Sequence, residues 1–403
     1  MSADTAPDWT WHEAQGLSRI VNVSGTMTGL GASVTRPEVA EATAAAMARF
    51  ARIHEMQLAA SGTIARLTGA EAGFLTASAS AGITLAIAGC MTGLSPARVE
   101  ALPRDPGLRN AVAVQLGHLC DYGAPLSQSI ELAGARVRPL GQSTQATDYQ
   151  LEAACDEGCA AALYVVSHHV VHYGQIPFER FVAIAHERGV PVIVDAASEY
   201  DLTSFIARGA DIAIYSGHKF LGGPTSGIVA GRKDLVRAGY MQNAGIGRGM
   251  KIGKESIAGA MAAMELWMTR DHAAVRAEEE AALEMWQTAL EPLAGITPHR
   301  IPDPTGNPLS RLQVNVDAGL AGCTAAGFAA ALGRRDPSIV VRAHEVELGY
   351  FQLDPCNLRP GQAALVRDAL VEVLSEGAAI ETSPEDLASA RQGGIEGYLA
   401  WNA

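Results

Sequence analysis

The sequence predicts an α/β protein whose large domain holds a mostly parallel, seven-stranded sheet, followed by a smaller α/β domain. Two observations support this fold class. Short apolar runs alternate along the chain with stretches of helical periodicity, and strands separated by helices form parallel sheets that are covered on both faces. The length of 403 residues also exceeds what one hydrophobic core supports, so at least two domains are expected.

Seven apolar runs bounded by Gly, Asp, Ser or His are the predicted strands. A helix is predicted over 177–189, because Pro177 precedes an apolar stripe of helical spacing and Gly189 follows it. Ligands of such sheets bind beyond the carboxyl ends of the strands, so the residues after each run are the first candidates for a site. The predicted strands cover residues 72–78, 111–116, 135–140, 161–167, 190–195, 211–216 and 226–231.

The domain organisation follows from these runs. Residues 31–275 are expected to form the large, cofactor-binding domain, and residues 276–403 a linking helix with the small C-terminal domain. The stretch 254–290 reads as one long helix that leaves the large domain. Residues 1–30 are expected to pack near the small domain, and no structure is predicted for the tail 384–403.

Composition excludes several classes of protein. The formal charge of −13 and a pI near 5.3 argue against broad surfaces for nucleic acid or anionic membranes. The polar, acidic start does not resemble a secretory signal, and no apolar run reaches the length of a membrane span. The six cysteines show no C-x-x-C spacing, so we interpret them as core thiols. A cytoplasmic protein is expected.

One lysine stands where burial would change its chemistry. Lys219 lies in "DIAIYSGHKFLGGPTSGIVAG" (211–231), just after a predicted buried strand. Burial disfavours the ammonium form and produces a nucleophilic amine, whose usual partner is a carbonyl such as the aldehyde of pyridoxal phosphate. The alternative is a solvated lysine in a glycine-rich turn.

Other strand ends supply what the pyridoxal ring requires. Asp195 ends the strand 190–195 and would keep the pyridinium nitrogen protonated. His118 and Ala197 are candidates for the two faces of the ring. The alternatives are that Asp195 caps a helix beginning at "DAAS" and that His118 is a hydrogen-bonded core histidine.

The phosphate group has its own candidates. The turn that contains Ser78, Ala79 and Ser80 precedes the helical "ITLAIAGCM", and free N–H groups at a helix start bind phosphate. Ser216 ends another strand and is a further phosphate candidate. Small residues before a helix also occur simply because they allow close packing.

Four blocks resemble a known family. They resemble the selenocysteine synthase-like group of fold type I pyridoxal-phosphate enzymes and, within it, the D-glucosaminate-6-phosphate ammonia-lyases. A looser similarity over 305–376 includes a hairpin of the small domain. The resemblance implies pyridoxal 5'-phosphate as cofactor, Lys219 as the Schiff-base lysine, Asp195 as the pyridinium partner, and Ser78 to Ser80 with Ser216 at the phosphate. The blocks are "IVNVSGTMTGLGAS" (20–33), "LTGAEAGFLTASASAGITLAIAG" (67–89), "VVSHHVVHYGQIPFERFVAIAHERGVPVIVDAASEYDL" (165–202) and "YSGHKFLGGPTSGIVAG" (215–231).

The resemblance favours α,β-elimination on a hydroxylated amino acid or amino sugar acid, with release of ammonia and a 2-keto acid. The residues themselves leave racemisation, aldol cleavage, transamination and selenium transfer open, and also a binding protein without cofactor. Fold type I sites usually form between two subunits, so a homodimer or larger homo-oligomer is expected. Selenocysteine synthases carry an N-terminal extension that engages tRNA, whereas about twenty residues precede "IVNVSG" here, so no nucleic acid partner is expected.

Three histidines could transfer protons near the cofactor. His169 is the predicted donor to the departing hydroxyl, because imidazole titrates near neutrality and His169 follows a strand end. His168 is expected at the substrate or the cofactor's 3'-oxygen. His218 stands beside the lysine, where the lyases have a small residue, and adds a possible acid or base. No metal is expected, because side chains of adjacent residues on an extended chain point opposite ways and no acidic ligand accompanies them.

Cationic residues are candidates for binding the substrate's anionic groups. Arg248 and Lys251 lie in "GIGRGMKIGKES" (245–256), which is either a substrate clamp or an ordinary cationic loop. Arg342, in the predicted strand "SIVVRAHE", is a candidate for the substrate carboxylate, because guanidinium pairs with carboxylate through two hydrogen bonds. Its alternative is a salt-bridged position at a sheet edge.

Overall fold

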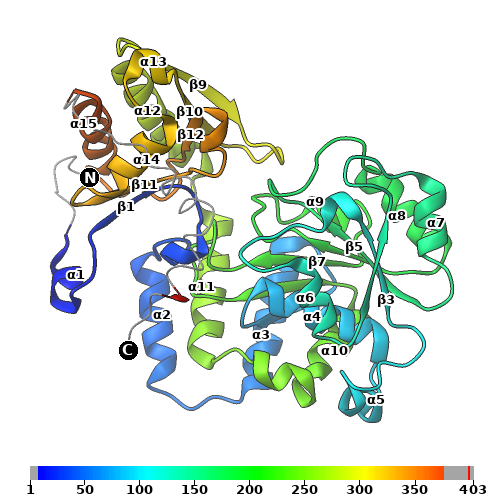
Figure 1. Cartoon of the computed structure of the whole chain (residues 1–403). Helices are drawn as coiled ribbons and strands as arrows, with labels where there is room; N and C mark the ends of the chain where they lie inside the picture. The colour runs from blue at the N-terminus through cyan, green and yellow to red at the C-terminus, as the bar shows by residue number, and fades with distance from the viewer. Residues whose placement is uncertain (1–7, 376–397, 400–403) are drawn as a thin grey trace. The chain divides into compact units, whose positions relative to one another are not determined.

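The computed structural model describes residues 8–375 and 398–399 and divides into two compact units (Figure 1). One unit spans Val34–Arg270, and the other joins the chain up to Ser33 with the chain from Asp271 onward. The sequence placed these divisions after residues 30 and 275. Residues 1–7 of the predicted N-terminal segment lie outside the described residues. Residues 376–397 and 400–403 of the predicted C-terminal segment also lie outside them, and these include most of the tail 384–403.

The larger unit is built on a seven-stranded sheet of order β2-β8-β7-β6-β5-β3-β4. Its strands pair in parallel from β4 to β7, and β8 runs antiparallel to both of its neighbours. Each of the seven predicted runs forms one of these strands, so the mostly parallel sheet is confirmed. The strands are β2 (Ala72–Thr76), β3 (Ala111–Gln115), β4 (Arg136–Leu140), β5 (Cys159–Val165), β6 (Val192–Asp195), β7 (Ile212–Ser216) and β8 (Gly227–Gly231).

Helices cover both faces of this sheet. Helix α4 (Ala79–Thr92) packs on one face with Leu163 and Val165, and it is apolar on almost every side because α10 (Lys233–Met241) covers it in turn. Tyr164 points to the opposite face, where its ring meets Phe178 and Phe181 of α8 (Phe178–Glu187). The remaining helices of this unit are α2 (Pro37–Met47), α3 (Ile53–Thr68), α5 (Pro96–Ala101), α6 (Leu126–Glu131), α7 (Asp148–Ala154), α9 (Ser204–Ala207) and α11 (Lys254–Thr269).

The predicted helix 254–290 is wrong as a single element. The structure has two helices, α11 and α12 (His272–Leu290). Arg270 leaves the helical conformation with ψ of 135°, and the Asp271 side chain then accepts the backbone N–H of Ala274. Aspartate is a strong N-cap, so it starts a second helix where the apolar pattern alone suggested continuity.

The smaller unit contains two sheets. Strands β9 (Ile296–Pro302), β10 (Ser310–Val316) and β12 (Tyr350–Leu353) are antiparallel in the order β12-β10-β9. Strand β1 (Ile20–Val23) pairs in parallel with β11 (Ser338–Val341). The other elements are α1 (Thr10–Gln15), α12, α13 (Ala318–Ala321), α14 (Ala325–Gly333), α15 (Gln362–Ser375) and the short 3-10 helices η1 (Thr28–Leu30) and η5 (Val346–Leu348).

The expected hairpin of the small domain takes a different form. Strands β11 and β12 belong to separate sheets, and an isolated bridge joins Arg342, directly after β11, to Gln352 of β12. The partner of β11 is instead β1, which lies more than three hundred residues earlier in the chain. Asn357 strengthens this link, because its side-chain amide donates to the carbonyls of Gly25 and Ala32, each at 3.0 Å. The N-terminal segment is thereby part of the smaller unit.

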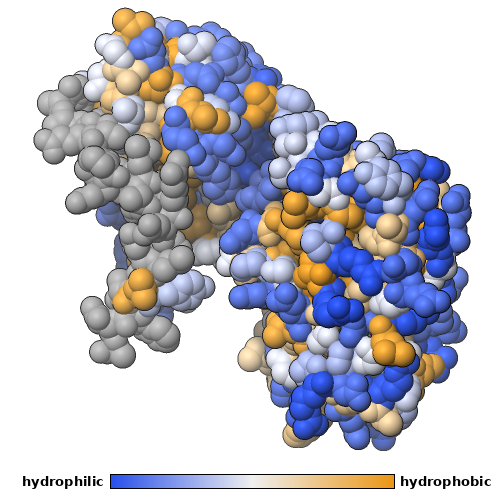
Figure 2. All heavy atoms as spheres, turned by 45° about the vertical axis from the view of Figure 1, so that its right-hand side comes forward, coloured by the Kyte–Doolittle hydropathy of each residue, from blue (hydrophilic) through white to orange (hydrophobic). Residues whose placement is uncertain are grey.

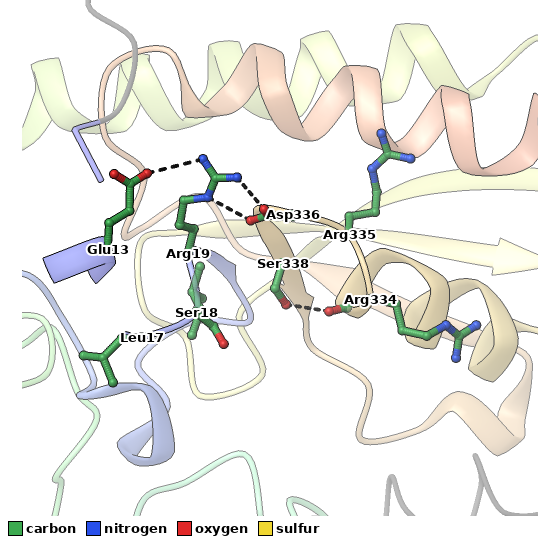
Figure 3. A pocket seen from close by; sticks show the side chains of 10 residues that line it. Glu13, Leu17, Ser18, Arg19, Arg334, Arg335, Asp336 and Ser338 are labelled. Carbon is green, nitrogen blue, oxygen red and sulfur yellow. Dashed lines mark hydrogen bonds and ion pairs between the residues drawn. The ribbon is translucent and has the colours of Figure 1, made fainter. Parts of the chain in front are cut away.

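A cavity of about 690 Å³ lies in the smaller unit, where the segment before β1 meets the turn between α14 and β11 (Figure 3). The guanidinium of Arg19 pairs with the carboxylate of Asp336 across it, with Nε 2.8 Å from Oδ1. None of the residues predicted for the active site lines this cavity.

The surface is chemically mixed. In Figure 2, hydrophilic side chains cover most of the visible face, and hydrophobic side chains form smaller groups between them. Over residues 8–375, no helix combines the length and the apolar character that crossing a membrane requires.

Candidate active site

The carboxyl ends of β6 and β7 bring Lys219 to Asp195. Asp195 is the last residue of β6, and Lys219 lies in the turn that follows β7, the neighbouring parallel strand. The ammonium of Lys219 donates a hydrogen bond to the hydroxyl of Ser198, which lies in the turn after β6. Two residues separated by 23 positions are thus neighbours because parallel strands end at the same edge.

Burial shifts the pKa of both groups toward their neutral forms. Burial lowers the pKa of Lys219, and the carboxylates of Asp195 and Glu199 partly oppose this change. Burial raises the pKa of Asp195, whereas the charge of Lys219 and the backbone N–H of Ala197 oppose it. Each group therefore favours the charged form of the other in a site that otherwise disfavours charge.

The interpretation of Asp195 as a helix cap does not fit the structure. The Asp195 carboxylate accepts the N–H of Ala197 at 3.2 Å, but the chain then turns, and the next helix begins only at Ser204. Ala197 is held between the two strands, because its carbonyl accepts the N–H of Ser216 at 3.2 Å. The carboxylate is thus fixed at the strand end.

The predicted phosphate turn forms the start of α4. Ser78 is the N-cap, and its hydroxyl accepts the N–H of Ala81 at 3.1 Å. In the described part of the chain, the N–H groups of Ala79 and Ser80 have no hydrogen-bond acceptor, as is usual at a helix start. They present the positive end of a long, buried helix and suit a phosphate dianion.

Gly227 on β8 allows the start of α4 to lie against the sheet. A Cβ atom at Gly227 would lie 2.1 Å from the carbonyl oxygen of Ser78. Ser216 is the direct partner of Gly227 on the neighbouring strand, and its hydroxyl bonds to Nδ1 of His218 at 2.9 Å. Strand pairing therefore brings Ser216 and the start of α4 to the same end of the sheet.

Sequence reasoning missed two hydroxyl side chains at this place. The hydroxyl of Ser80 lies 2.7 Å from that of Ser129 on α6, and the hydroxyl of Tyr122 lies 2.6 Å from Ser129. The hydroxyls of Tyr122 and Ser80 lie 3.4 Å apart. The rule that pointed to residues after strands could have found Tyr122, which lies in the loop after β3. Ser129 carries no such signal, because it lies within a helix.

His118 is a buried, hydrogen-bonded histidine of the core. It is buried, its Nδ1 accepts the N–H of Val165 at 3.2 Å, and its ring meets that of Tyr164 edge-on at 4.6 Å. Burial lowers the pKa of His118 to about 4, so its ring is neutral at physiological pH. Contact between His118 and the cofactor ring stays a prediction. Burial and then the negative charge of Asp195 raise the pKa of Cys120, which lies in the same loop, to about 11.

His168 and His169 do not point in opposite directions. The chain turns directly after β5, and the two ring centroids lie 4.0 Å apart. The expectation of opposed side chains assumed an extended backbone, which the turn replaces. Within residues 8–375, no three His, Cys, Asp or Glu side chains come together as a metal site would require. The role of His169 as proton donor stays a prediction.

His218 is the second histidine beside the lysine. Burial lowers the pKa of His218, and the charge of Lys219 lowers it further. Its Nδ1 is already bonded to the Ser216 hydroxyl. His218 is therefore a neutral hydrogen-bonding group near physiological pH.

The predicted substrate cations lie in different units. Arg248 is exposed on η4 (Ile246–Met250), a short 3-10 helix held beside the start of α4, because the carbonyl of Met250 accepts the N–H of Ala77 at 3.3 Å. Lys251 is exposed next to it. Arg342 is buried in the smaller unit, directly after β11, and burial lowers its pKa.

The site fits the cofactor that the sequence predicts. A half-buried lysine with a depressed pKa, a buried carboxylate beside it, and a helix start with free N–H groups are the groups that pyridoxal phosphate needs for its aldehyde, ring nitrogen and phosphate. All three lie at one edge of the sheet in the larger unit. They come from β6, the turn after β7, and α4.

Comparison with known proteins gives the same result. A curated relative from Salmonella typhimurium, a D-glucosaminate-6-phosphate ammonia lyase, is 38% identical over 367 residues, which is 91% of this chain and 98% of the relative. A 5'-C-glycyluridine monooxygenase-decarboxylase from Streptomyces is 36% identical over 92% of this chain and 94% of its own length. A solved structure of D-glucosaminate-6-phosphate ammonia-lyase has a TM-score of 0.83 at 37% identity and covers 93% of this chain and 100% of that one.

More distant structures share the fold. An aspartate aminotransferase from Thermus thermophilus aligns with a TM-score of 0.54 at 18% identity, over 89% of this chain and 99% of that chain.

Residues 20–294 match the family described as "SelA: L-seryl-tRNA selenium transferase". The chain therefore belongs to the SelA family, within the fold type I enzymes whose cofactor is pyridoxal 5'-phosphate.

Proposed function

We propose that this protein is a pyridoxal-phosphate lyase that eliminates ammonia from a hydroxylated amino acid or amino sugar acid and leaves a 2-keto acid. The single observation that carries the proposal is Lys219, half-buried at a strand end beside Asp195 and Ser198, with its pKa lowered by desolvation. The Salmonella relative, named for ammonia release from D-glucosaminate 6-phosphate, supports this reaction class. Family similarity favours elimination over the other reactions of such a site.

The residues have defined tasks in this proposal. The cofactor, when bound, withdraws electrons from the substrate Cα, which makes its proton acidic. Lys219 takes that proton, and the lowered pKa of its amine keeps a larger fraction in the neutral form that acts as a base. Ser198 accepts a hydrogen bond from the Lys219 amine and orients it. Asp195 holds a proton on the ring nitrogen through its negative charge.

Loss of the β-hydroxyl requires a proton donor, and we assign this role to His169. His218 is less suited, because burial and the Lys219 charge lower its pKa and keep it neutral. His168 lies against His169 and orients its ring. In this proposal Arg248, in the same unit as Lys219, binds an anionic group of the substrate. The assignment of Arg342 to the substrate carboxylate stays a prediction from the sequence.

The test follows a Cα-deuterated substrate in a panel of hydroxylated amino acids and D-sugar amino acids. Elimination predicts loss of the label, with ammonia and keto acid in equal amounts and no requirement for an added keto acid. Racemisation releases no ammonia, transamination needs an acceptor, and aldol cleavage yields an aldehyde. An oxygen-free arm is included because of the Streptomyces relative, and a strict requirement for oxygen would overturn the lyase proposal.

His169→Ala provides a more specific test of the same scheme. If His169 protonates the leaving hydroxyl, the variant still exchanges the Cα proton with solvent but releases ammonia far more slowly. A matched control is His172→Ala, which changes a histidine of the same loop that has no assigned role. Equal loss of exchange and elimination would show that His169 positions the cofactor instead.

We also propose that the protein works in the cytoplasm as at least a homodimer. Four apolar side chains lie exposed at the end of α2, in the loop that follows it and on α3: Met47, Phe50, Ile53 and Leu58, with exposed fractions of 64, 106, 41 and 76%. Apolar groups that cluster on a surface commonly mark protein interfaces. Phe50→Glu combined with Leu58→Glu is expected to shift the mass in light scattering toward the monomer, whereas an unchanged mass would place the interface elsewhere.

A further inference from the structure

Three hydroxyl groups meet at the start of α4. Ser80 lies in the first turn of α4, Ser129 is buried on α6, and Tyr122 lies half-buried in the loop between β3 and α6. The contact between Tyr122 and Ser129 is 2.6 Å and that between Ser129 and Ser80 is 2.7 Å, whereas the direct contact from Tyr122 to Ser80 is 3.4 Å. The two short contacts form a chain that ends at Ser80.

Because each of the three hydroxyls has one proton to donate, the hydrogen bonds of this chain can all run in one direction, toward Ser80. Each hydroxyl donates one hydrogen bond and can accept two. If Ser80 donates to an outside acceptor, it can accept from Ser129, which in turn accepts from Tyr122. Each donor in such a chain is strengthened by the bond that it accepts. With no outside acceptor, all three protons are used among the three hydroxyls.

The surroundings keep this chain in place. The side chain of Thr84, one turn further along α4, donates to the carbonyl of Ser129 at 2.6 Å and fixes α6 to α4. Burial raises the pKa of Tyr122, and the negative charge of Asp195 raises it further, although the bonds to Ser129 and Ser80 oppose this. Tyr122 is thus a protonated donor throughout the physiological range.

We propose that Tyr122 and Ser129 are positioning residues that direct the Ser80 hydroxyl to the phosphate of the cofactor, in the order Tyr122 to Ser129 to Ser80 to phosphate. The inference rests on the proposed function, because it places the cofactor phosphate at the free N–H groups of Ala79 and Ser80. No covalent bond changes in this arrangement. Only the orientation of three hydroxyl protons differs between the free and the loaded protein.

The experiment measures cofactor affinity in the apo protein with two ligands, pyridoxal 5'-phosphate and pyridoxal, which lacks the phosphate. Tyr122→Phe keeps the ring and removes the hydroxyl, and it is expected to weaken the phosphorylated ligand by up to roughly tenfold, the order of one neutral hydrogen bond. The dissociation constant of pyridoxal should not change. Tyr149→Phe, at an exposed tyrosine of the same unit, is the matched control.

A double-mutant cycle tests the route through Ser80. Ser80→Ala should weaken phosphate-bearing ligand at least as much as Tyr122→Phe, and adding Tyr122→Phe to Ser80→Ala should cause no further loss. Additive losses would overturn the proposed relay of hydrogen bonds from Tyr122 through Ser129 to Ser80. Equal losses of affinity for pyridoxal 5'-phosphate and pyridoxal would also overturn it, because they would place Tyr122 against the ring. An unchanged affinity in Tyr122→Phe would overturn it as well.

Two further measurements separate the possible failures. Thermal melts of each apo variant show whether it folds. A further variant, Ser129→Ala, removes the middle hydroxyl of the chain, and Tyr122→Phe remains the deciding variant if Ser129→Ala does not fold. The phosphorus resonance of the bound cofactor is expected to shift in Tyr122→Phe if the relay reaches the phosphate. If the wild-type protein binds no pyridoxal phosphate, the proposed function fails with the inference. If it binds the cofactor normally but the variants do not differ, only the inference fails.

Discussion

At the scale of single residues, the site depends on the mutual stabilisation of two charges, one on the buried Asp195 and one on the half-buried Lys219. Burial favours the neutral form of both Lys219 and Asp195, and each charge favours the other. Such opposed influences are typical of functional sites, where the protonation state must change during a reaction. The neighbouring Ser198 adds a polar acceptor for the amine.

Lys219→Ala tests the nucleophile. We expect complete loss of turnover and of the cofactor adduct that borohydride reduces onto the chain, with the fold of the apo protein retained. Mass spectrometry after reduction locates the adduct. Lys251→Ala, at an exposed lysine, is the control and should label normally. A reducible adduct in Lys219→Ala would assign the nucleophile to another lysine.

Asp195→Asn tests the carboxylate and predicts a change with pH. Because the Asp195 charge raises the pKa of Lys219, its removal lowers that pKa further, so the neutral amine prevails at lower pH. The pH midpoint for attachment of the cofactor should therefore move down, measured by the rate of absorbance change. Turnover should fall by orders of magnitude, since the ring nitrogen loses its charged partner. Near-normal turnover would make Asp195 a structural residue.

At the scale of elements, the site depends on how closely α4 meets the sheet. Strand β8 approaches the start of α4 at Gly227, where the space for a Cβ is already filled by the Ser78 carbonyl. Behind α4, a Cβ at Gly89 would lie 2.5 Å from the backbone nitrogen of Gly239 on α10. Small residues on both sides thus fix the position of the helix whose start is the phosphate candidate.

Gly227→Ala should displace the start of α4. The added methyl group would overlap the Ser78 carbonyl, so we expect a loss of about 1–3 kcal/mol in the free energy of unfolding and weaker binding of pyridoxal phosphate. Gly62→Ala on α3 is the control, because its Cβ would meet only the end of the Arg66 side chain at 3.8 Å. Chemical denaturation and cofactor titration measure the two effects. If the folded Gly227→Ala protein bound pyridoxal phosphate with full affinity, the close approach of β8 would not be required for the phosphate site.

At the scale of the whole molecule, two units have separate cores, and each has its own buried polar cluster. In the smaller unit, Arg311 lies between two buried carboxylates, with contacts of 2.7 Å to Asp303 and 2.8 Å to Asp354. Burial raises the pKa of Asp303, but hydrogen bonds from Thr305 and the charge of Arg311 outweigh it, so the net shift is downward. The cluster joins β10, β12 and the loop after β9.

Arg311→Met should destabilise the smaller unit selectively. Removing the cation leaves buried carboxylates without their partner, which costs about 3–5 kcal/mol. Because the pKa of Asp303 is lowered in the folded state, its stabilising contribution is present near neutral pH and lost in acid. The difference between wild type and variant should therefore be largest near neutrality and shrink as the pH falls.

Hydrogen exchange localises this effect. Peptides from α12, β10 and β12 should exchange faster in Arg311→Met, and peptides from α4 and β3 to β7 should not change. Arg300→Met is the control, since Arg300 pairs with Glu280 and Glu284 at the surface, where ion pairs contribute little. Uniform acceleration over both units would show that they unfold together.

The sequence by itself was sufficient for the seven strands of the large sheet, the fold type I class, the family and the cofactor, all of which are confirmed. The strands and the residues at their ends can be predicted from local sequence, because each buried strand needs its own apolar run and the polar residues that follow a run lie at a strand end. Lys219 and Asp195 could be paired in this way because neighbouring parallel strands end at one edge.

Only the tertiary structure decided which distant segments meet. It reversed β8, turned His169 against His168, and placed β1 beside β11. It also drew His118 into the core, and it brought Ser129, which lies within a helix and carries no signal in the sequence, to Ser80 and Tyr122. Such contacts depend on packing and on the balance of many burial and hydrogen-bond energies across the fold, which no local pattern contains.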